Sequence, residues 1–217
     1  MEDLTAVNLL LAPDESICDQ ARALNAELRR DLGWGFAFDE THQPHITVLQ
    51  RYVRRADLER ALTAIGQASA GTDLDELPLR GTGLSTAEFG TPPGTVLVSL
   101  DVEPTAALRG LQETLLEAVA PFSVAGGTAS AFFTIAGEPT IGSETIAYVE
   151  GFVPEHTGPR YAPHMTVGVG DERFAASLKA RFEGLSFTAC ALAAYQLGDL
   201  GTARRALRSW PRAALAA

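Results

Sequence analysis

The sequence has little of what marks membrane, secreted or disordered proteins. Its longest apolar runs, such as residues 7–12, are far shorter than the roughly 20 residues of a membrane-spanning helix. The acidic start of the chain lacks the basic residues and the apolar core of a secretory signal. Two cysteines, Cys18 and Cys190, are too few for a disulfide framework. We therefore expect a cytoplasmic protein without a membrane partner, whose two thiols are buried and reduced.

Lysine is almost absent, since 16 of the 17 basic residues are arginines and only Lys179 is a lysine. This bias is typical of a GC-rich bacterial genome. Acidic residues are in excess, so the net charge is −10 and the pI is about 4.8. Because an acidic surface repels a phosphate backbone, we expect no long nucleic-acid footprint. A small pocket for one or two phosphates stays compatible with this charge, and we expect a monomer.

Several signatures of phosphate binding and hydrolysis are also missing. The chain contains neither a Walker motif nor the GxSxG elbow of serine hydrolases. It does contain 46% hydrophobic residues in 217 positions. That is enough to bury a sizeable core.

Segments with strand and helix patterns alternate along the chain. The expected strands cover residues 4–12, 44–53, 77–89, 95–102, 131–136, 145–153, 163–169 and 185–197, before a last strand or short helix that ends near residue 210. The expected helices begin near Asp14, Asp57, Thr105 and Asp171.

The order strand, helix, loop, strand, helix occurs twice, and the turn at residues 91–94 separates the two occurrences. This repeat predicts an α+β fold made of a duplicated unit. We expect one bilobal domain over residues 1–217, with lobes at about 1–92 and 93–217 that can exchange strands. Mainly antiparallel sheets would face a central cleft, with the helices outside.

One short motif occurs at the same place in both halves. It reads Pro-His-Ile-Thr-Val around His45 and Thr47, and Pro-His-Met-Thr-Val around His164 and Thr166. The two histidines are 119 residues apart in the chain, at 45 and 164. Since residues i and i+2 of a strand point to the same face, each His shares a face with its Thr. Packed about a twofold axis, the two pairs would face each other across the cleft.

This arrangement suits the cleavage of a phosphodiester. The reaction needs a base for the attacking hydroxyl or water and an acid for the leaving oxygen on the opposite side. Imidazole titrates near neutral pH, so two histidines can supply both groups without a metal. The two threonine hydroxyls can donate hydrogen bonds to the non-bridging oxygens and hold the phosphate in line.

On these two motifs, the chain resembles the 2H phosphoesterase superfamily, which includes the RNA 2′,3′-cyclic phosphodiesterases also called 2′-5′ RNA ligases. The aromatic-x-Pro-His sequence that begins at Tyr161 is also common before the second motif of that superfamily. The resemblance implies the bilobal fold over essentially the whole chain. It also implies catalytic roles for His45, Thr47, His164 and Thr166, while the substrates of the superfamily vary widely. We expect an enzyme that opens a 2′,3′-cyclic phosphate or cleaves a related small nucleotide or RNA-end phosphodiester.

Three further residues are candidates for substrate binding. Arg51 has the strand parity of His45 and Thr47 and can reach the substrate from the same face, or it is a solvated strand end. Arg160 and Tyr161 precede the second motif in a loop and can line the cleft, and Tyr161 can stack on a base or simply pack.

The remaining histidines and a loop of aromatic residues give weaker signals. A metal site of His42, His45 and His164 is conceivable, but we expect no metal and no cofactor. His156 lies in a turn-like segment, which indicates a solvated loop residue. Phe36 and its neighbours Trp34 and Phe38 are expected to form a local cluster that covers the core.

Two other functions remain open beside the cyclic phosphodiesterase. The first is a module that binds a nucleotide or an RNA end without turnover. The second is RNA 2′-5′ ligation, which is the same chemistry in the reverse direction. The acidic composition makes a long RNA substrate the less attractive choice. The sequence does not decide whether residues 121–163 close over the cleft.

Overall fold

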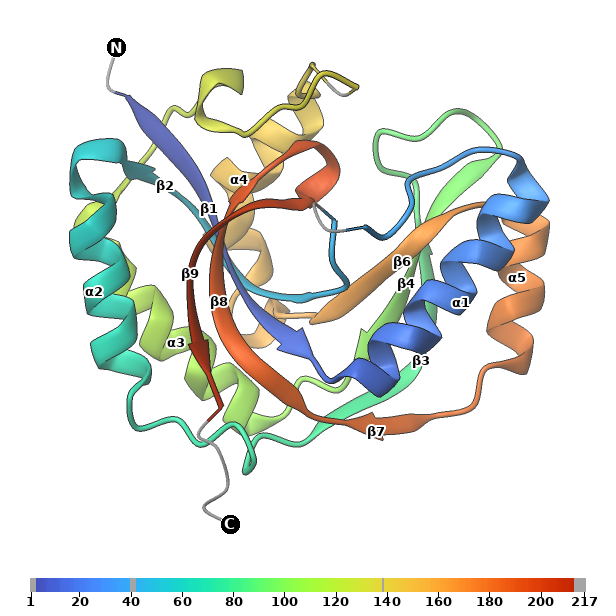
Figure 1. The fold of residues 1–217 in the computed structure, drawn as a ribbon, viewed down its shortest axis with the longest axis horizontal. Coiled ribbons are helices and arrows are strands. Elements are labelled where there is room, and N and C mark those ends of the chain that lie inside the picture. The colour runs from blue at the N-terminus through green and yellow to red at the C-terminus, as the bar shows by residue number, and fades with distance from the viewer. Residues whose placement is uncertain (1–2, 40–41, 138, 213–217) are drawn as a thin grey trace.

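The fold consists of two antiparallel sheets with helices around them, in a computed structural model that describes residues 3–39, 42–137 and 139–212 (Figure 1). The first sheet has the order β5-β2-β1-β8-β9. It contains β1 (Leu4–Pro13), β2 (Ile46–Arg54), β5 (Ser123–Val124), β8 (Ala189–Leu197) and β9 (Ala203–Pro211). The second sheet has the order β6-β4-β3-β7. It contains β3 (Leu79–Ala87), β4 (Thr95–Val102), β6 (His164–Asp171) and β7 (Leu185–Phe187).

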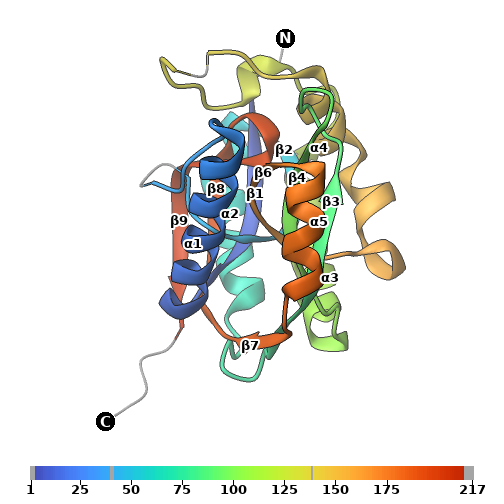
Figure 2. The same ribbon diagram turned by 90° about the vertical axis from the view of Figure 1, so that its right-hand side faces the viewer.

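The helices pack against the two sheets in separate groups. The α-helices are α1 (Glu15–Leu32), α2 (Leu58–Ser69), α3 (Ala106–Val119), α4 (Ser143–His156) and α5 (Glu172–Arg181). Short 3-10 helices are η1 (Arg55–Asp57), η2 (Ala120–Phe122), η3 (Ala129–Ala131), η4 (Gly158–Arg160) and η5 (Asp199–Gly201). Helices α1 and α5 lie side by side on the second sheet, whereas α2 and α3 pack on each other and on β2 (Figures 1 and 2). The α+β class with antiparallel sheets is therefore confirmed.

The two halves of the chain exchange elements. Strand β3 belongs to the first half but pairs with β4 in the second sheet, and β8 and β9 return to the first sheet. Helix α1 follows β1, yet it packs on β6. That contact is close, because a side chain at Gly168 or Gly170 would come within 2.7 Å or 2.6 Å of Leu28. The turn at residues 91–94 is thus not a boundary between the two sheets.

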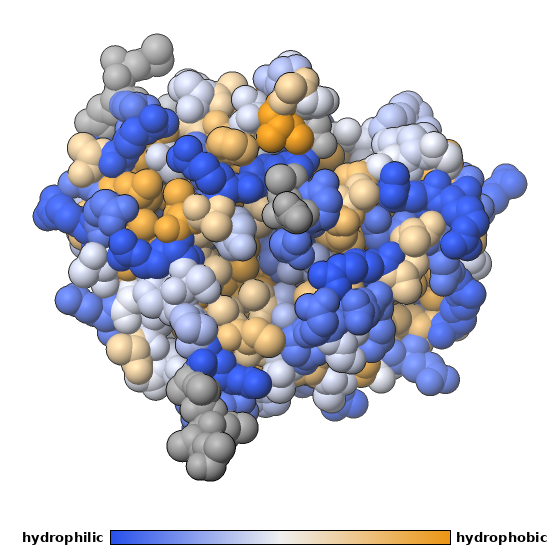
Figure 3. Space-filling view, in the orientation of Figure 1, coloured by the Kyte–Doolittle hydropathy of each residue, from blue (hydrophilic) through white to orange (hydrophobic). Residues whose placement is uncertain are grey.

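Local sequence explains where the helices begin. The Asp14 carboxylate accepts a hydrogen bond from the Ile17 backbone N–H and starts α1, as predicted. Asp171 caps α5 in the same way, also as predicted, and Thr105 caps α3. On the face seen in Figure 3, hydrophilic side chains gather over α1, and its apolar side is buried. This amphipathic pattern is what the spacing of its apolar residues predicted.

Two predicted strands are wrong. Residues 145–153 lie inside α4, and residues 131–136 run from the end of η3 through irregular chain. The β-branched and aromatic residues of α4 favour a strand on propensity alone. Burial overrides that propensity, because Thr145, Val149 and Phe152 follow a helical spacing and are buried.

Smaller differences concern the end of the chain. The single strand predicted at 185–197 is two strands, β7 and β8, which end in different sheets. The break falls at Thr188, whose backbone N–H donates to Asp14. Cys18 is buried as expected, but Cys190 is exposed, and neither is in a disulfide. Within the described residues, no helix is long and apolar enough to cross a membrane.

Candidate active site

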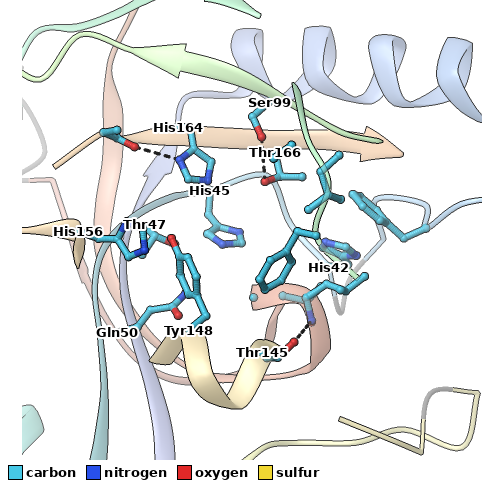
Figure 4. A pocket seen from close by; sticks show the side chains of 18 of the residues that line it. His42, His45, Thr47, Gln50, Ser99, Thr145, Tyr148, His156, His164 and Thr166 are labelled. Carbon is cyan, nitrogen blue, oxygen red and sulfur yellow. Dashed lines mark hydrogen bonds between the residues drawn. The ribbon is translucent and has the colours of Figure 1, made fainter. Parts of the chain in front are cut away.

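A cleft of about 330 Å³ lies between the two sheets and contains both His-x-Thr motifs (Figure 4). Both sheets contribute strand residues, and the segment that precedes β2, helix α4 and the turn between β8 and β9 complete its walls. The described residues that line it are Phe36, Phe38, His42, His45, Thr47, Gln50, Ala87, Glu88, Phe89, Leu97, Ser99, Thr145, Tyr148, His156, Ala162, His164, Thr166, Leu200, Gly201 and Thr202. Two motifs far apart in the chain thus meet in one cavity.

The strand parity of the motifs is as predicted. Ile46 and Val48 on β2 are fully buried, as are Met165 and Val167 on β6. The His and Thr that alternate with them line the cleft. Figure 4 shows the rings of His45 and His164 together in the middle of the cavity.

Both histidines are held by the same backbone contact. His45 Nδ1 lies 2.9 Å from the Gln43 carbonyl oxygen, and His164 Nδ1 lies 3.0 Å from the Ala162 carbonyl oxygen. A carbonyl oxygen only accepts, so Nδ1 carries the proton in both rings. The Nε2 atom of each ring is then the one that can exchange a proton with a ligand, as a general acid or base requires. At His45 the Gly201 backbone is a second partner of the same ring.

Burial lowers the pKa of His45 below its ordinary value. Hydrogen bonds to the Gln43 and Gly201 backbones oppose this lowering of the pKa, and the nearby charge of His164 adds to it. The electrostatic influence of His164 agrees with the proximity of the two rings. The first motif therefore holds a histidine that favours its neutral form.

The two threonines differ in their neighbours. Thr166 Oγ1 lies 3.2 Å from Ser99 Oγ on the adjacent strand β4. The backbone carbonyl of Thr47 accepts a hydrogen bond of 2.9 Å from the Tyr161 hydroxyl. The second motif is thus contacted at the hydroxyl of its threonine, and the first motif at the backbone carbonyl of its threonine.

Comparison with known proteins places the whole arrangement in a family. A family model described as "2'-5' RNA ligase superfamily" matches residues 13–199, which is most of the chain and includes both motifs. The chain belongs to the 2′-5′ RNA ligase superfamily. The predicted membership of the 2H phosphoesterases is therefore confirmed, and this family suggests an activity of the cyclic phosphodiesterase type.

Solved structures of this superfamily's fold are similar over nearly the whole chain. E. coli LigT in its apo form is 15% identical, with a TM-score of 0.52, over 96% of this chain and 98% of LigT. E. coli LigT complexed with phosphate is 14% identical, with a TM-score of 0.50 and the same coverage. At such low identity the likeness shows the fold. No curated protein sequence matches the chain.

Strand parity predicted that Arg51 faces the cleft with His45 and Thr47. This prediction is wrong, since His45 and Thr47 line the cleft and Arg51 does not. The register between β1 and β2 shifts after Thr47, because Leu10 pairs with Thr47 but Leu9 pairs with Leu49. This β-bulge adds one residue and reverses the parity of the rest of the strand. Gln50 therefore lines the cleft in place of Arg51. Gln50 is 2% exposed, and its Oε1 has no hydrogen-bond partner among the described residues.

Neither of the two candidates before the second motif is at the cleft. Tyr161 is 4% exposed and packs in the core, where its hydroxyl reaches Thr47. Arg160 is exposed in η4. Neither is among the described residues that line the cleft. Packing, one of the two alternatives for Tyr161, is what the structure has.

All four histidines of the chain line the same cleft. The prediction of a solvated loop for His156 is wrong, since it ends α4 and stacks on Tyr148 with ring centroids 4.6 Å apart. His42 is 5% exposed and stacks on Phe36 at 4.2 Å, and burial lowers its pKa to about 3. Within the described residues, no three His, Cys, Asp or Glu side chains form a group that could hold a metal ion.

The aromatic loop is part of the cleft wall as well as of the core. Phe36 and Phe38 line the cleft, whereas Trp34 is 44% exposed. Segment 121–163, whose role the sequence left open, contributes Thr145, Tyr148 and His156 of α4 to the wall. Ser99 and Gln50 carried no sequence signal, because only strand register places them here.

Proposed function

We propose that this chain is a metal-independent phosphodiesterase that opens 2′,3′-cyclic phosphates or related small nucleotide or RNA-end phosphodiesters. The observation that carries the proposal is the meeting of two His-x-Thr pairs, one from each sheet, in a single cleft. Both histidines have the same Nδ1 contact with a backbone carbonyl.

The proposed reaction divides the work between the two rings. The neutral Nε2 of one histidine removes a proton from water as its oxygen attacks phosphorus. The protonated Nε2 of the other gives its proton to the 2′ or 3′ oxygen as the phosphorus–oxygen bond breaks. A cyclic ester becomes a monoester, and the two rings end with their protonation states exchanged.

The threonines would stabilise the charge that develops on the phosphate. Each hydroxyl of Thr47 and Thr166 can donate a hydrogen bond to a non-bridging oxygen. Among the described lining residues there is no Arg or Lys, so these hydroxyls and the imidazolium carry that task. This supports a ligand with one phosphate rather than a long RNA. A LigT structure of the same fold is a complex with phosphate.

The walls of the cleft fit a nucleoside attached to that phosphate. Phe36, Phe89 and Tyr148 present aromatic rings to the cavity, and nucleobases stack on such rings with little dependence on sequence. The volume of about 330 Å³ suits a small ligand.

The test is turnover of 2′,3′-cyclic nucleotides in the presence of EDTA, with products followed by phosphorus NMR. We expect hydrolysis by the wild type and a loss of at least about 10²-fold in the double variant His45→Ala, His164→Ala. Near-normal turnover in the double variant, or turnover that EDTA abolishes, would refute the proposal. Nucleotide binding without product would favour the binding module, and affinity that falls steeply with salt would favour an RNA substrate.

A further inference from the structure

Both motif strands contain an extra residue directly after the threonine. On β2 the register passes from Thr47 to Leu49, so that Val48 is the extra residue opposite β1. On β6 it passes from Thr166 to Gly168, so that Val167 is the extra residue opposite β4. The two β-bulges occupy the same position relative to the catalytic pair. A bulge bends its strand and changes the direction of neighbouring side chains.

A buried side-chain amide binds the carbonyl of each extra residue. Gln112 Nε2 donates to the Val48 oxygen at 2.9 Å, and Asn25 Nδ2 donates to the Val167 oxygen at 2.9 Å. Gln112 is 2% exposed and Asn25 is 3% exposed. Neither residue lines the cleft, so neither is placed to touch a substrate.

The two amides come from exchanged helices. Gln112 lies on α3, which precedes the second motif, but it binds the strand of the first motif. Asn25 lies on α1, which precedes the first motif, but it binds the strand of the second. The contact is therefore repeated with the symmetry of the duplicated unit.

Each amide also fixes a second part of the cleft wall. Asn25 Nδ2 donates to the Phe36 carbonyl at 3.1 Å, and Gln112 Nε2 donates to the His156 carbonyl at 3.1 Å. Gln112 Oε1 in addition accepts a hydrogen bond of 3.0 Å from the Gly158 N–H. Phe36 and His156 both line the cleft. One buried side chain thus connects a catalytic strand with the wall beside it.

We infer that Asn25 and Gln112 are positioning residues that set the geometry of the two His-x-Thr pairs; this rests on the function proposed above. A buried carbonyl that loses its donor carries a desolvation penalty, so the bulge would rearrange to avoid it. Such a change moves the Thr and His that lie one and three residues before the extra residue. Small displacements of reacting groups can reduce rates about 100-fold.

A general role in stability is the competing explanation, and the chain offers a matched control for it. Gln196 is also a glutamine, 3% exposed, and its Nε2 donates to the Ala131 carbonyl at 2.8 Å. That carbonyl belongs to η3 and not to a motif strand. Gln112→Met and Gln196→Met both replace a buried amide that donates to a backbone carbonyl. Gln112 makes three hydrogen bonds and Gln196 makes one among the described residues, so the control matches Gln112 in burial and in its donor bond.

The first measurement compares steady-state rates and melting temperatures of these variants. We expect Gln112→Met and Asn25→Leu to lower kcat by about 10- to 100-fold, with KM changed only a few-fold. Gln196→Met should also lower the melting temperature, by less because it removes one hydrogen bond instead of three, and should leave kcat within about three-fold. If Gln112→Met destabilises the fold too much, Gln112→Glu keeps the size of the side chain and replaces its donor. Equal losses of kcat in Gln112→Met and Gln196→Met would overturn the inference.

A second measurement needs no substrate and separates this inference from the proposed reaction. Nitrogen-15 NMR of the four imidazoles reports their tautomers and surroundings. Gln112→Met should change the His45 signals more than those of His164, and Asn25→Leu should do the opposite. Wild-type protein without turnover would refute the proposed function, yet these spectra would still test the positioning. Uniform or absent changes in both variants would overturn it.

Discussion

The two motif strands have the same backbone design in different surroundings. Strands β2 and β6 share the Nδ1 contact, the bulge after the threonine and the amide that binds it. The first motif is enclosed by the buried His42 and by the Tyr161 hydroxyl on its backbone. The second has Ser99 beside its threonine and the half-buried His156 near its histidine. A duplicated unit can thus place two identical groups symmetrically and still give them different surroundings.

The largest expected effect tests whether the two motifs are equally required. His45→Ala and His164→Ala should each lower kcat by about 10²- to 10⁴-fold, because each removes one of two proton transfers. The double variant should be little worse than either single one, since the two groups act as a unit. Steady-state kinetics with a cyclic nucleotide gives the comparison, and Cys190→Ala, an exposed change outside the cleft, is the control. Near-normal turnover in one single variant would make that motif a bystander.

Substitution of the two threonines sharpens the comparison. Thr47→Val and Thr166→Val keep the shape and remove the hydroxyl, and we expect a loss of kcat of about 10²-fold in each. Ser99→Ala should lower kcat only a few-fold, since it removes only the partner of Thr166. If Thr47→Val were harmless, the phosphate would be held by the second sheet alone.

The burial of His42 beside the first motif predicts that the stability of the fold depends on pH. The pKa of His42 is about 3 in the folded protein, against about 6.5 without the fold. Between these values the unfolded chain holds a proton that the folded chain lacks, so stability falls as the pH decreases from about 6.5 towards 3. The slope for one proton is up to about 1.4 kcal/mol per pH unit, and His45 acts in the same direction.

Urea unfolding between pH 7.5 and pH 5 measures that slope. His42→Phe keeps a ring beside Phe36 and should flatten the slope. His156→Phe should flatten it less, because the half-buried His156 is desolvated less than the buried His42. An identical effect of both substitutions would remove the difference between the two regions.

The smallest effect concerns the Tyr161 hydroxyl, which supports the first motif from the loop between η4 and β6. Tyr161→Phe removes the hydrogen bond to the Thr47 carbonyl and should cost about 1 kcal/mol of stability, with a loss of kcat of a few-fold. Tyr52→Phe is its control. Tyr52 lies on β2, as Thr47 does, and its hydroxyl donates to the Ile146 carbonyl of α4. That variant should lose stability without the change in kcat, and the reverse result would contradict the comparison.

The parts of the site that depend on local sequence could be predicted. Strand alternation placed His45 and Thr47 on one face, and the carboxylate of Asp14 marked the start of α1. Strand register could not be predicted, since it depends on pairing between distant segments. A single bulge therefore put Gln50 where parity placed Arg51. Helix α4 was missed because packing of one face overrides the strand propensity of its residues.

The exchange of strands between the two halves has a consequence for biosynthesis. Strand β1 lies inside the first sheet, and one of its edges pairs with residues 189–196 of β8. Strand β3 pairs with β4 on one side and with the much later β7 on the other. Most pairings thus join distant parts of the chain, which favours slow folding. The ribosome must synthesise residues up to Thr202 before the cleft around His45 is complete, so little of the candidate site can form while the earlier residues are being translated.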